Sequence, residues 1–310
     1  MPLAMGFPPS AVQTLLLFLF IGLGFWAGRL GILDEATTKG LSKFLVAFIV
    51  PALILDSMQQ PLTPALRDSA WLVLGISFGV YGLSFLLAFP YVRLLGAGGG
   101  ESGALVFGAV FSNVVFMGFP VLEATLGKES LFIASIYNIP FQLLAYSVGP
   151  YILSRGEGGQ PRFKVSSFVT PAGLASVVGF GLFLLDFSLP APLLGAVRLL
   201  GSTTTPLSMA LIGAILSRLP FTALAGRPRV WLLALFRLAL FPAALYLLLR
   251  LLGLRGLLLS LPVLVAAMPV AANAAILSEA YGGDARTASA LVLLTTLLSL
   301  LTIPVAASLL

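Results

Sequence analysis

The sequence predicts an all-α polytopic membrane protein with ten transmembrane helices, arranged as two inverted five-helix repeats. Three observations carry this prediction: the composition, the number of long apolar runs, and the distribution of basic residues between those runs. Of the 310 residues, 59% are hydrophobic and only 9% are charged, and the mean hydropathy is +1.08. Soluble domains contain about 25% charged residues. The composition therefore excludes a water-soluble globular protein.

Ten apolar runs along the chain are long enough to cross a bilayer. A spanning helix needs about 20 mostly apolar residues. Runs of this length, bounded by charges or by Gly and Pro clusters, lie near residues 10–31, 38–58, 69–94, 102–126, 130–154, 167–187, 192–217, 229–252, 256–281 and 286–309. An even number of spans places both termini on the same side of the membrane.

The basic residues divide unequally between the two sides of the predicted bundle. One side holds eleven of them: Arg29, Lys39, Lys43, Arg93, Arg155, Arg162, Lys164, Arg218, Arg227, Arg229 and Arg286. The other side holds five: Arg67, Lys128, Arg198, Arg250 and Arg255. Cytoplasmic loops carry the excess of Lys and Arg, so we expect a multi-pass protein of the cytoplasmic (inner) membrane with both termini outside. Basic residues scattered in this way do not predict a nucleic-acid partner.

A polar connector at residues 155–164 separates two halves of five spans each, residues 1–154 and 165–310. Because five is odd, the second half must enter the membrane from the side opposite to the first. Inverted repeats with interrupted helices are typical of secondary transporters, which bind their substrates at the interruptions.

Proline-containing segments recur in corresponding spans of the two halves. The second span contains VPALILDSM (50–58), and the seventh contains TPLSMALIG (205–213). The fourth contains GFPVLEATLG (118–127), and the ninth contains AMPVAANAAILSEAYGG (267–283). Proline is also common in membrane helices that carry no repeat. Two matching pairs nevertheless favour the repeat.

The fourth and ninth spans contain the candidate binding site. Asn113 precedes Gly118 and Pro120 in the fourth span, and Asn273 follows Pro269 by one turn in the ninth. Proline removes a backbone donor and glycine permits unusual backbone angles, so both helices are predicted to open at membrane depth. Two such helices crossing at their breaks would offer amide side chains and helix N-termini to an anion. Either Asn alone could instead only join neighbouring helices.

Three carboxylates within or near the ends of spans are candidates for ion coupling: Asp56, Glu123 and Glu279. The chain has no His and no Cys, which excludes disulfides, Cys or His metal sites, and thiol or imidazole catalysis. Proton coupling would therefore have to use a carboxylate. Ionisable residues inside membranes suggest function, but solvation at the membrane interface is the favoured interpretation for each of the three. Glu123 and Glu279 follow the predicted breaks and are the stronger candidates.

Further polar residues lie inside predicted spans. Tyr137 and Gln142, with Asn138, give the fifth span a polar stripe that faces either the crossing or a neighbouring helix. Arg237 lies about 12 Å along the eighth span, at 1.5 Å per residue. It either neutralises a substrate carboxylate or has a structural role, extending to the headgroups or pairing within the bundle. The structural role is the favoured interpretation.

The segment NVVFMGFP (113–120), followed by Gly127, resembles the fourth-helix motif of the auxin efflux carrier family, which contains plant PIN-type carriers and bacterial relatives. Residues 267–281 are similar to the ninth-helix motif, and Val50-Pro51 is similar to part of the second helix. The resemblance implies the fold of bile-acid/sodium symporters. Spans one, two, six and seven would form a scaffold that dimerises, and spans three to five and eight to ten a transport domain that moves like an elevator.

The resemblance also implies an organic anion as substrate. Two departures argue against the plant substrate: the connector is short, and Asn273-Ala274 stands where the plant pattern has Val-Pro. Bacterial relatives are linked to small carboxylates such as malonate and malate, so a small carboxylate is expected.

The predicted function is secondary transport of this anion by alternating access, without a metal, a cofactor or enzymatic activity. A sodium-coupled bile-acid-type symporter is the first alternative, but it needs several oxygen ligands for the cation. Asn113, Asn273 and Glu279 are few for that purpose. An intramembrane enzyme lacks a paired nucleophile and base, and a channel would be recognised by continuous conductance.

Overall fold

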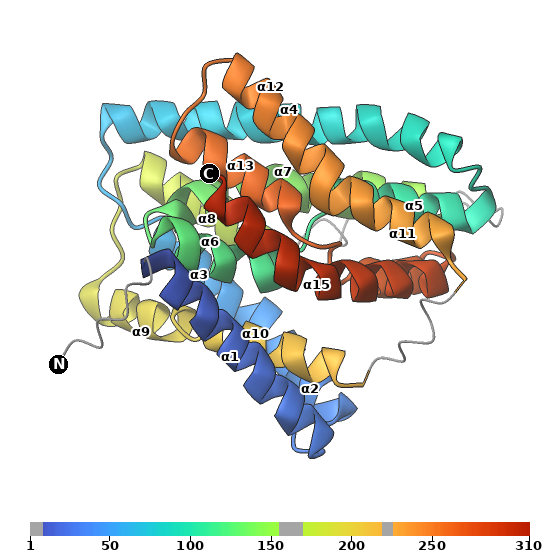
Figure 1. The fold of residues 1–310 in the computed structure, drawn as a ribbon. Coiled ribbons are helices and arrows are strands. Elements are labelled where there is room, and N and C mark those ends of the chain that lie inside the picture. The colour runs from blue at the N-terminus through green and yellow to red at the C-terminus, as the bar shows by residue number, and fades with distance from the viewer. Residues whose placement is uncertain (1–8, 155–169, 219–225) are drawn as a thin grey trace.

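The computed structural model describes residues 9–154, 170–218 and 226–310, which are helical throughout apart from short connections and one isolated antiparallel bridge (Figure 1). The α-helices are α1 (Pro9–Arg29), α2 (Glu35–Phe44), α3 (Val50–Ser57), α4 (Pro64–Leu94), α5 (Gly99–Val110), α6 (Phe119–Leu126), α7 (Ser130–Leu153), α8 (Pro171–Leu184), α9 (Ala191–Gly201), α10 (Thr204–Leu216), α11 (Pro228–Leu235), α12 (Phe241–Leu251), α13 (Leu257–Ala267), α14 (Ala274–Ala280) and α15 (Ala285–Ser308). The predicted connector at 155–164 lies outside the described residues.

Six helical segments of the described chain are long and apolar enough to cross a membrane: Glu35–Ser57, Pro64–Leu94, Ser130–Leu153, Ala191–Leu216, Pro228–Leu251 and Ala285–Ser308. Four shorter apolar helices accompany them: Leu15–Arg29, Val114–Leu126, Pro171–Leu184 and Leu257–Ala267. Each of the ten predicted spans overlaps one of these ten segments. The prediction of an all-α polytopic membrane protein is confirmed.

Three π-helical turns interrupt the regular helices of the described residues, and each ends two residues before a proline. They are η1 (Leu45–Ile49), η2 (Val114–Gly118) and η6 (Phe236–Leu240), followed by Pro51, Pro120 and Pro242. Proline lacks an N–H and its ring clashes with the carbonyl four residues earlier. A turn with i→i+5 geometry moves that carbonyl away. The helices therefore continue through these prolines instead of ending there.

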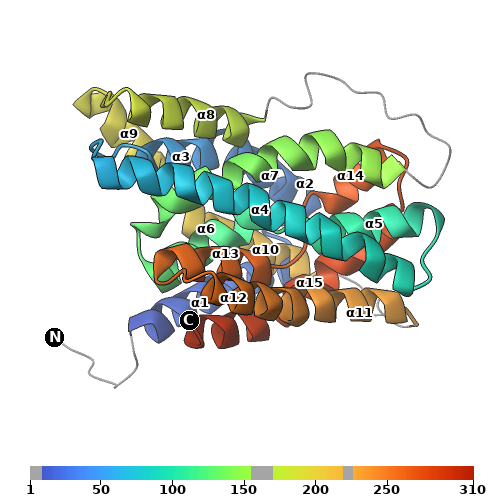
Figure 2. The same ribbon diagram turned by 90° about the horizontal axis from the view of Figure 1, so that it is seen from above.

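The helices form two groups that lie on opposite sides of the molecule. Figure 1 shows α1, α2, α9 and α10 together on one side, and α4, α5, α11, α12 and α15 on the other. Figure 2, seen from above, places α8 and α9 along one edge and α11 and α12 along the opposite edge. Within the first group α1 packs along α10. The short helix α3 packs on α9 of this group and on α8.

Two glycines allow α1 and α10 to approach one another closely. A Cβ added at Gly24 would lie 1.9 Å from the carbonyl oxygen of Ala210, and one added at Gly213 would lie 1.9 Å from that of Ile21. Both distances are far below any permitted contact. The two backbones therefore touch directly, as small residues allow between membrane helices.

Candidate functional site

Two helices of the described chain are fully interrupted, and the interruptions cross. One break separates α5 from η2 at residues 111–113, and the other separates α13 from α14 at residues 268–273. The backbone N–H of Asn113 donates to the Pro269 carbonyl at 2.8 Å, and the backbone N–H of Ala271 donates to the Phe111 carbonyl at 3.0 Å. These bonds make a short antiparallel bridge. One backbone N–H and one backbone carbonyl of each break are thus satisfied by the other break.

The first break begins earlier than the proline pattern predicted. Gly118 and Pro120 were expected to open the fourth span, yet both lie in continuous helix, where η2 passes into α6. The wide turn relieves the proline clash, so the backbone opens at Ser112 and Asn113 instead. Pro269, in contrast, lies inside the second break. Gly118 and Pro120 are both buried.

The two predicted asparagines lie at the starts of the helices that follow the breaks. Asn113 caps η2, where its Oδ1 accepts from the Phe116 amide at 3.2 Å, a common use of Asn at a helix start. Its Nδ2 has no hydrogen-bond partner among the described residues. Asn273 precedes α14 and donates its Nδ2 to the Tyr146 hydroxyl at 2.9 Å. Both side chains therefore retain hydrogen-bonding capacity for a ligand.

A cavity of about 100 Å³ lies beside the crossing and brings several of these side chains together. We call it the crossover cavity. Its polar lining residues are Ser112, Asn113, Gln142, Tyr146, Thr170 and Asn273, and its apolar ones include Val46, Phe116 and Phe141. The Thr170 hydroxyl donates to Gln142 Oε1 at 2.9 Å, which orients that amide. The lining of the crossover cavity contains no acidic or basic side chain.

Sequence reasoning reached three of these polar residues, Asn113, Gln142 and Asn273, and missed the other three. Tyr146 had a signal: it continues the stripe of Asn138 and Gln142 at four-residue spacing on α7. Ser112 was adjacent to a predicted residue but was not singled out. Thr170 begins α8 and comes close only through tertiary packing, so no local pattern marks it.

Tyr137 lies apart from the crossover cavity, in the core between α4 and α7. Its backbone carbonyl accepts from the Ser77 hydroxyl at 2.7 Å, and its ring lies 6.3 Å from that of Tyr81. Asn138 beside it is completely buried, and neither atom of its amide has a partner among the described residues. The predicted polar stripe therefore divides, and only its later part lines the cavity.

The three candidate coupling carboxylates do not line the crossover cavity. Glu123 accepts from the Thr205 hydroxyl at 2.8 Å, which joins α6 to α10. Asp56 forms a salt bridge with Arg198 at 3.2 Å, which joins α3 to α9. Glu279 is exposed near the end of α14. Coupling by these residues stays a prediction.

Arg237 lies on the far side of the crossing, where it is only 1% exposed. Its guanidinium donates to backbone carbonyls of both interrupted helices and to the Ser112 hydroxyl. It does not extend to the membrane surface, and it pairs with no carboxylate of the described chain. Of the two roles considered for it, this position agrees with the structural one.

Comparison with known proteins identifies the family. The family profile described as "Membrane transport protein" matches residues 10–307, nearly the whole chain. The chain belongs to this family of membrane transporters, the auxin efflux carrier family. The resemblance seen in the motifs is thereby confirmed, and so is the prediction that the protein is not an enzyme.

Relatives of this membrane transport protein align over almost their full lengths. An "Uncharacterized transporter" of Methanothermobacter thermautotrophicus is 29% identical over 305 residues, 97% of each chain. A second "Uncharacterized transporter", from Methanocaldococcus jannaschii, is 24% identical over 94% of this chain and 95% of its own. A Rhizobium meliloti protein named "Putative malonate transporter" is 23% identical over 92% of this chain and 91% of its own.

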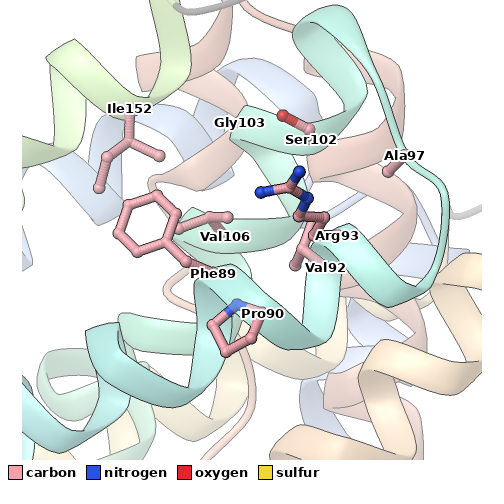
Figure 3. Close-up of a pocket in the computed structure, with 9 residues that line it drawn as sticks. All are labelled: Phe89, Pro90, Val92, Arg93, Ala97, Ser102, Gly103, Val106 and Ile152. Atoms are coloured by element: carbon pink, nitrogen blue, oxygen red, sulfur yellow. The ribbon is translucent and has the colours of Figure 1, made fainter.

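Two larger hollows of this membrane transport protein share no residue with the crossover cavity. One of about 500 Å³ lies between the end of α4 and the start of α5; Figure 3 shows the Arg93 guanidinium directed into it, near Ser102 and Gly103. The other, of about 610 Å³, is an apolar groove between α12, α13 and α15. Within the described ranges, no group of three or more acidic, His or Cys side chains is placed to hold a metal ion.

Proposed function

We propose that this transporter is a secondary carrier of a small organic anion, a carboxylate, that works by elevator-type alternating access. The observation that carries the proposal is the crossover cavity, where amide and hydroxyl groups gather at two crossing helix breaks. Its lining has hydrogen-bond donors and no carboxylate. A bound anion would therefore meet donors without like-charge repulsion, whereas a cation would find no charged ligand.

The size of the cavity favours a small substrate over a bile acid. At about 30 Å³ per water molecule, 100 Å³ holds about three waters. A steroid would require large rearrangement, whereas a short-chain carboxylate is closer to this volume. The name of the Rhizobium meliloti relative, "Putative malonate transporter", agrees with this substrate class.

Helix packing supports the inverted repeat. In an inverted repeat, span one corresponds to span six, span two to span seven, and so on. A contact between two helices should then recur between their two counterparts. The contact of α1 with α10 corresponds to that of α8 with α3, and the contact of α4 with α7 corresponds to that of α11 with α15. The contact of α5 with α15 likewise corresponds to that of α13 with α7.

An elevator movement would separate the scaffold (spans one, two, six and seven) from the transport domain (spans three to five and eight to ten). The crossover cavity would lie between these two parts. Its lining residues Val46 and Thr170 belong to the proposed scaffold, and its polar lining residues other than Thr170 belong to the proposed transport domain. Among the described residues, three hydrogen bonds cross the same boundary: Thr170 to Gln142, Ser57 to Ser135, and Thr205 to Glu123. All three would have to break during each transport cycle.

The test is flux in liposomes reconstituted with the purified protein. Radiolabelled malonate, malate, indole-3-acetate and taurocholate are supplied with and without a sodium gradient. Saturable uptake of a small carboxylate is expected, and its absence for every compound would refute the substrate class. Sodium-dependent taurocholate uptake would instead favour the bile-acid-type symporter.

Site variants locate the binding residues in the same assay. Asn113→Ala and Asn273→Ala are expected to abolish saturable flux while the purified proteins remain monodisperse. Asn138→Ala is the matched control, because Asn138 is the third Asn of the chain and does not line the crossover cavity. Normal transport by both cavity variants would show that the site lies elsewhere.

A further inference from the structure

The Arg237 guanidinium connects the carboxyl-terminal ends of both interrupted helices. Its Nη1 donates to the Ala109 carbonyl at 3.0 Å, in the last turn of α5. Its Nε donates to the Met268 carbonyl at 3.2 Å and its Nη2 to the Val265 carbonyl at 3.4 Å, both at the end of α13. Among the described residues, the Ala109 and Met268 carbonyls have no backbone N–H partner, and the Val265 carbonyl also accepts from the Met268 backbone N–H at 3.2 Å. One side chain therefore caps two helices that are distant in the sequence.

The charge of Arg237 is balanced by these helix ends. A buried charge is costly unless it is compensated, and among the described residues no carboxylate pairs with this one. Each helix C-terminus carries roughly half a negative charge. Two such ends sum to about one negative charge, which matches the guanidinium. The side of the crossing opposite the cavity is therefore close to neutral.

The remaining contact of Arg237 points toward the crossover cavity. Nη2 also donates to Oγ of Ser112, and Ser112 is a lining residue of that cavity. Because Oγ accepts from the guanidinium, the hydroxyl proton of Ser112 is free to donate. A donor whose oxygen is itself hydrogen-bonded to a cation is polarised and becomes stronger.

We propose that Arg237 and Ser112 form a donor relay: Ser112 donates its hydroxyl to the anion in the crossover cavity, and Arg237 is the positioning residue behind it. This rests on the proposed function, since it assumes that the cavity binds an anion. It adds a specificity element, because the relay strengthens an interaction that only an anion or another acceptor can make. Arg237 also fixes the two breaks relative to one another, so the cavity keeps its shape.

The bridging part is tested without any substrate. Hydrogen exchange of the purified protein in nanodiscs is compared between the natural chain, Arg237→Lys and Arg237→Met. Arg237→Met is expected to accelerate exchange of the Asn113 and Ala271 amides at least about tenfold, with α4 unchanged. Arg237→Lys keeps the charge but cannot span both helix ends. It should therefore accelerate hydrogen exchange at both breaks, but less than Arg237→Met does. If Arg237→Met does not fold, Arg237→Lys decides alone. Unchanged exchange at either break overturns the proposal.

The relay part is tested by anion affinity. Ser112→Ala is expected to raise the half-saturating malonate concentration about tenfold while the maximal rate and the thermal stability are retained. Ser112→Thr keeps a hydroxyl and should restore most of the affinity. Ser84→Ala is the matched control, a buried serine of α4 whose hydroxyl bonds only the Val80 carbonyl of its own helix.

The outcomes separate this proposal from the proposed function. Equal affinities for Ser112→Ala and Ser84→Ala overturn the relay even when transport by the natural chain is robust. If the natural chain neither transports nor binds any carboxylate, the proposed function fails and the relay fails with it. The bridging role is then decided by hydrogen exchange alone.

Discussion

The Asn273 amide donates to the Tyr146 hydroxyl at 2.9 Å, which joins α14 to α7 at the wall of the crossover cavity. The bond uses one N–H of Asn273 and one lone pair of Tyr146, so the tyrosine hydroxyl proton and Asn273 Oδ1 remain available. The pair therefore orders two groups that can face a ligand.

Tyr146→Phe is expected to raise the half-saturating carboxylate concentration about fivefold, because it removes one donor and releases the Asn273 amide. Concentration-dependent uptake in liposomes measures this. Tyr246→Phe is the control, since the Tyr246 hydroxyl contacts Arg250 on α12 and does not line the crossover cavity. An unchanged value in Tyr146→Phe would remove Tyr146 from the site.

Thr205→Val is expected to lower the free energy of unfolding by about 1–3 kcal/mol, because the half-buried Glu123 carboxylate loses its hydroxyl donor. Thermal unfolding in detergent measures this. Thr125→Val makes the same change on α6, where the hydroxyl bonds only the Val121 carbonyl of its own helix, and should cost less. Equal losses in the two variants would mean that the Glu123 contact contributes nothing specific.

Gly213→Ala and Gly24→Ala are each expected to destabilise the protein by several kcal/mol or to prevent folding, because the added methyl would overlap a backbone carbonyl of the neighbouring helix. Yield of monodisperse protein and its melting temperature are the measurements. Gly22→Ala is the matched control on α1, where nothing lies within 4 Å of the added atom. It should be neutral or slightly stabilising, because alanine favours helix.

Asp284 should contribute to stability in a pH-dependent way. Burial raises the pKa of its carboxyl, but hydrogen bonds from Thr287 and the Arg286 amide outweigh this and hold the pKa below its ordinary 3.8. A depressed pKa in the folded state gives stability that is present above pH 3.8 and is lost as the pH falls through the folded value. Asp284→Asn should therefore be less stable at neutral pH by about 0.3–1 kcal/mol, the value of a charge at the start of a helix such as α15.

Unfolding of Asp284→Asn and the natural chain is compared at pH 7 and at acid pH. The difference should disappear as the pH drops below 3.8. Glu279→Gln, which removes one exposed carboxylate near the end of α14, is the matched control for the loss of a negative charge. A difference for Asp284→Asn that persists in acid would assign its effect to packing instead of charge.

Much of the fold was predictable because the bilayer imposes a length and a polarity on every span. The ten apolar segments appear where the composition placed them. The location of the first break was not predictable from Pro120, since proline is compatible with either a break or a π-helical turn. The backbone opens where it pairs with the other break, through the bonds of Asn113 with Pro269 and of Ala271 with Phe111, and these are contacts between distant parts of the chain.

The site was predictable only in part for a related reason. Asn113 and Asn273 stand out as amides in apolar helices, and Gln142 belongs to a visible stripe. Thr170 comes from another helix of the proposed scaffold, and the function of Arg237 depends on which carbonyls surround it. Such partners are set by packing, and periodicity in a single helix carries no information about them.

The π-helical turn η6 fixes the direction in which Arg237 points. Such a turn contains about one residue more than an α-helical turn, so the chain beyond it is rotated by about 100° relative to an uninterrupted helix. The wider turn keeps three consecutive residues, Phe236, Arg237 and Leu238, on the buried face. A single-residue deletion here would restore an ordinary helix and change the register of everything that follows. In this membrane segment a change in the number of residues would therefore redirect Arg237 even if every side chain stayed apolar.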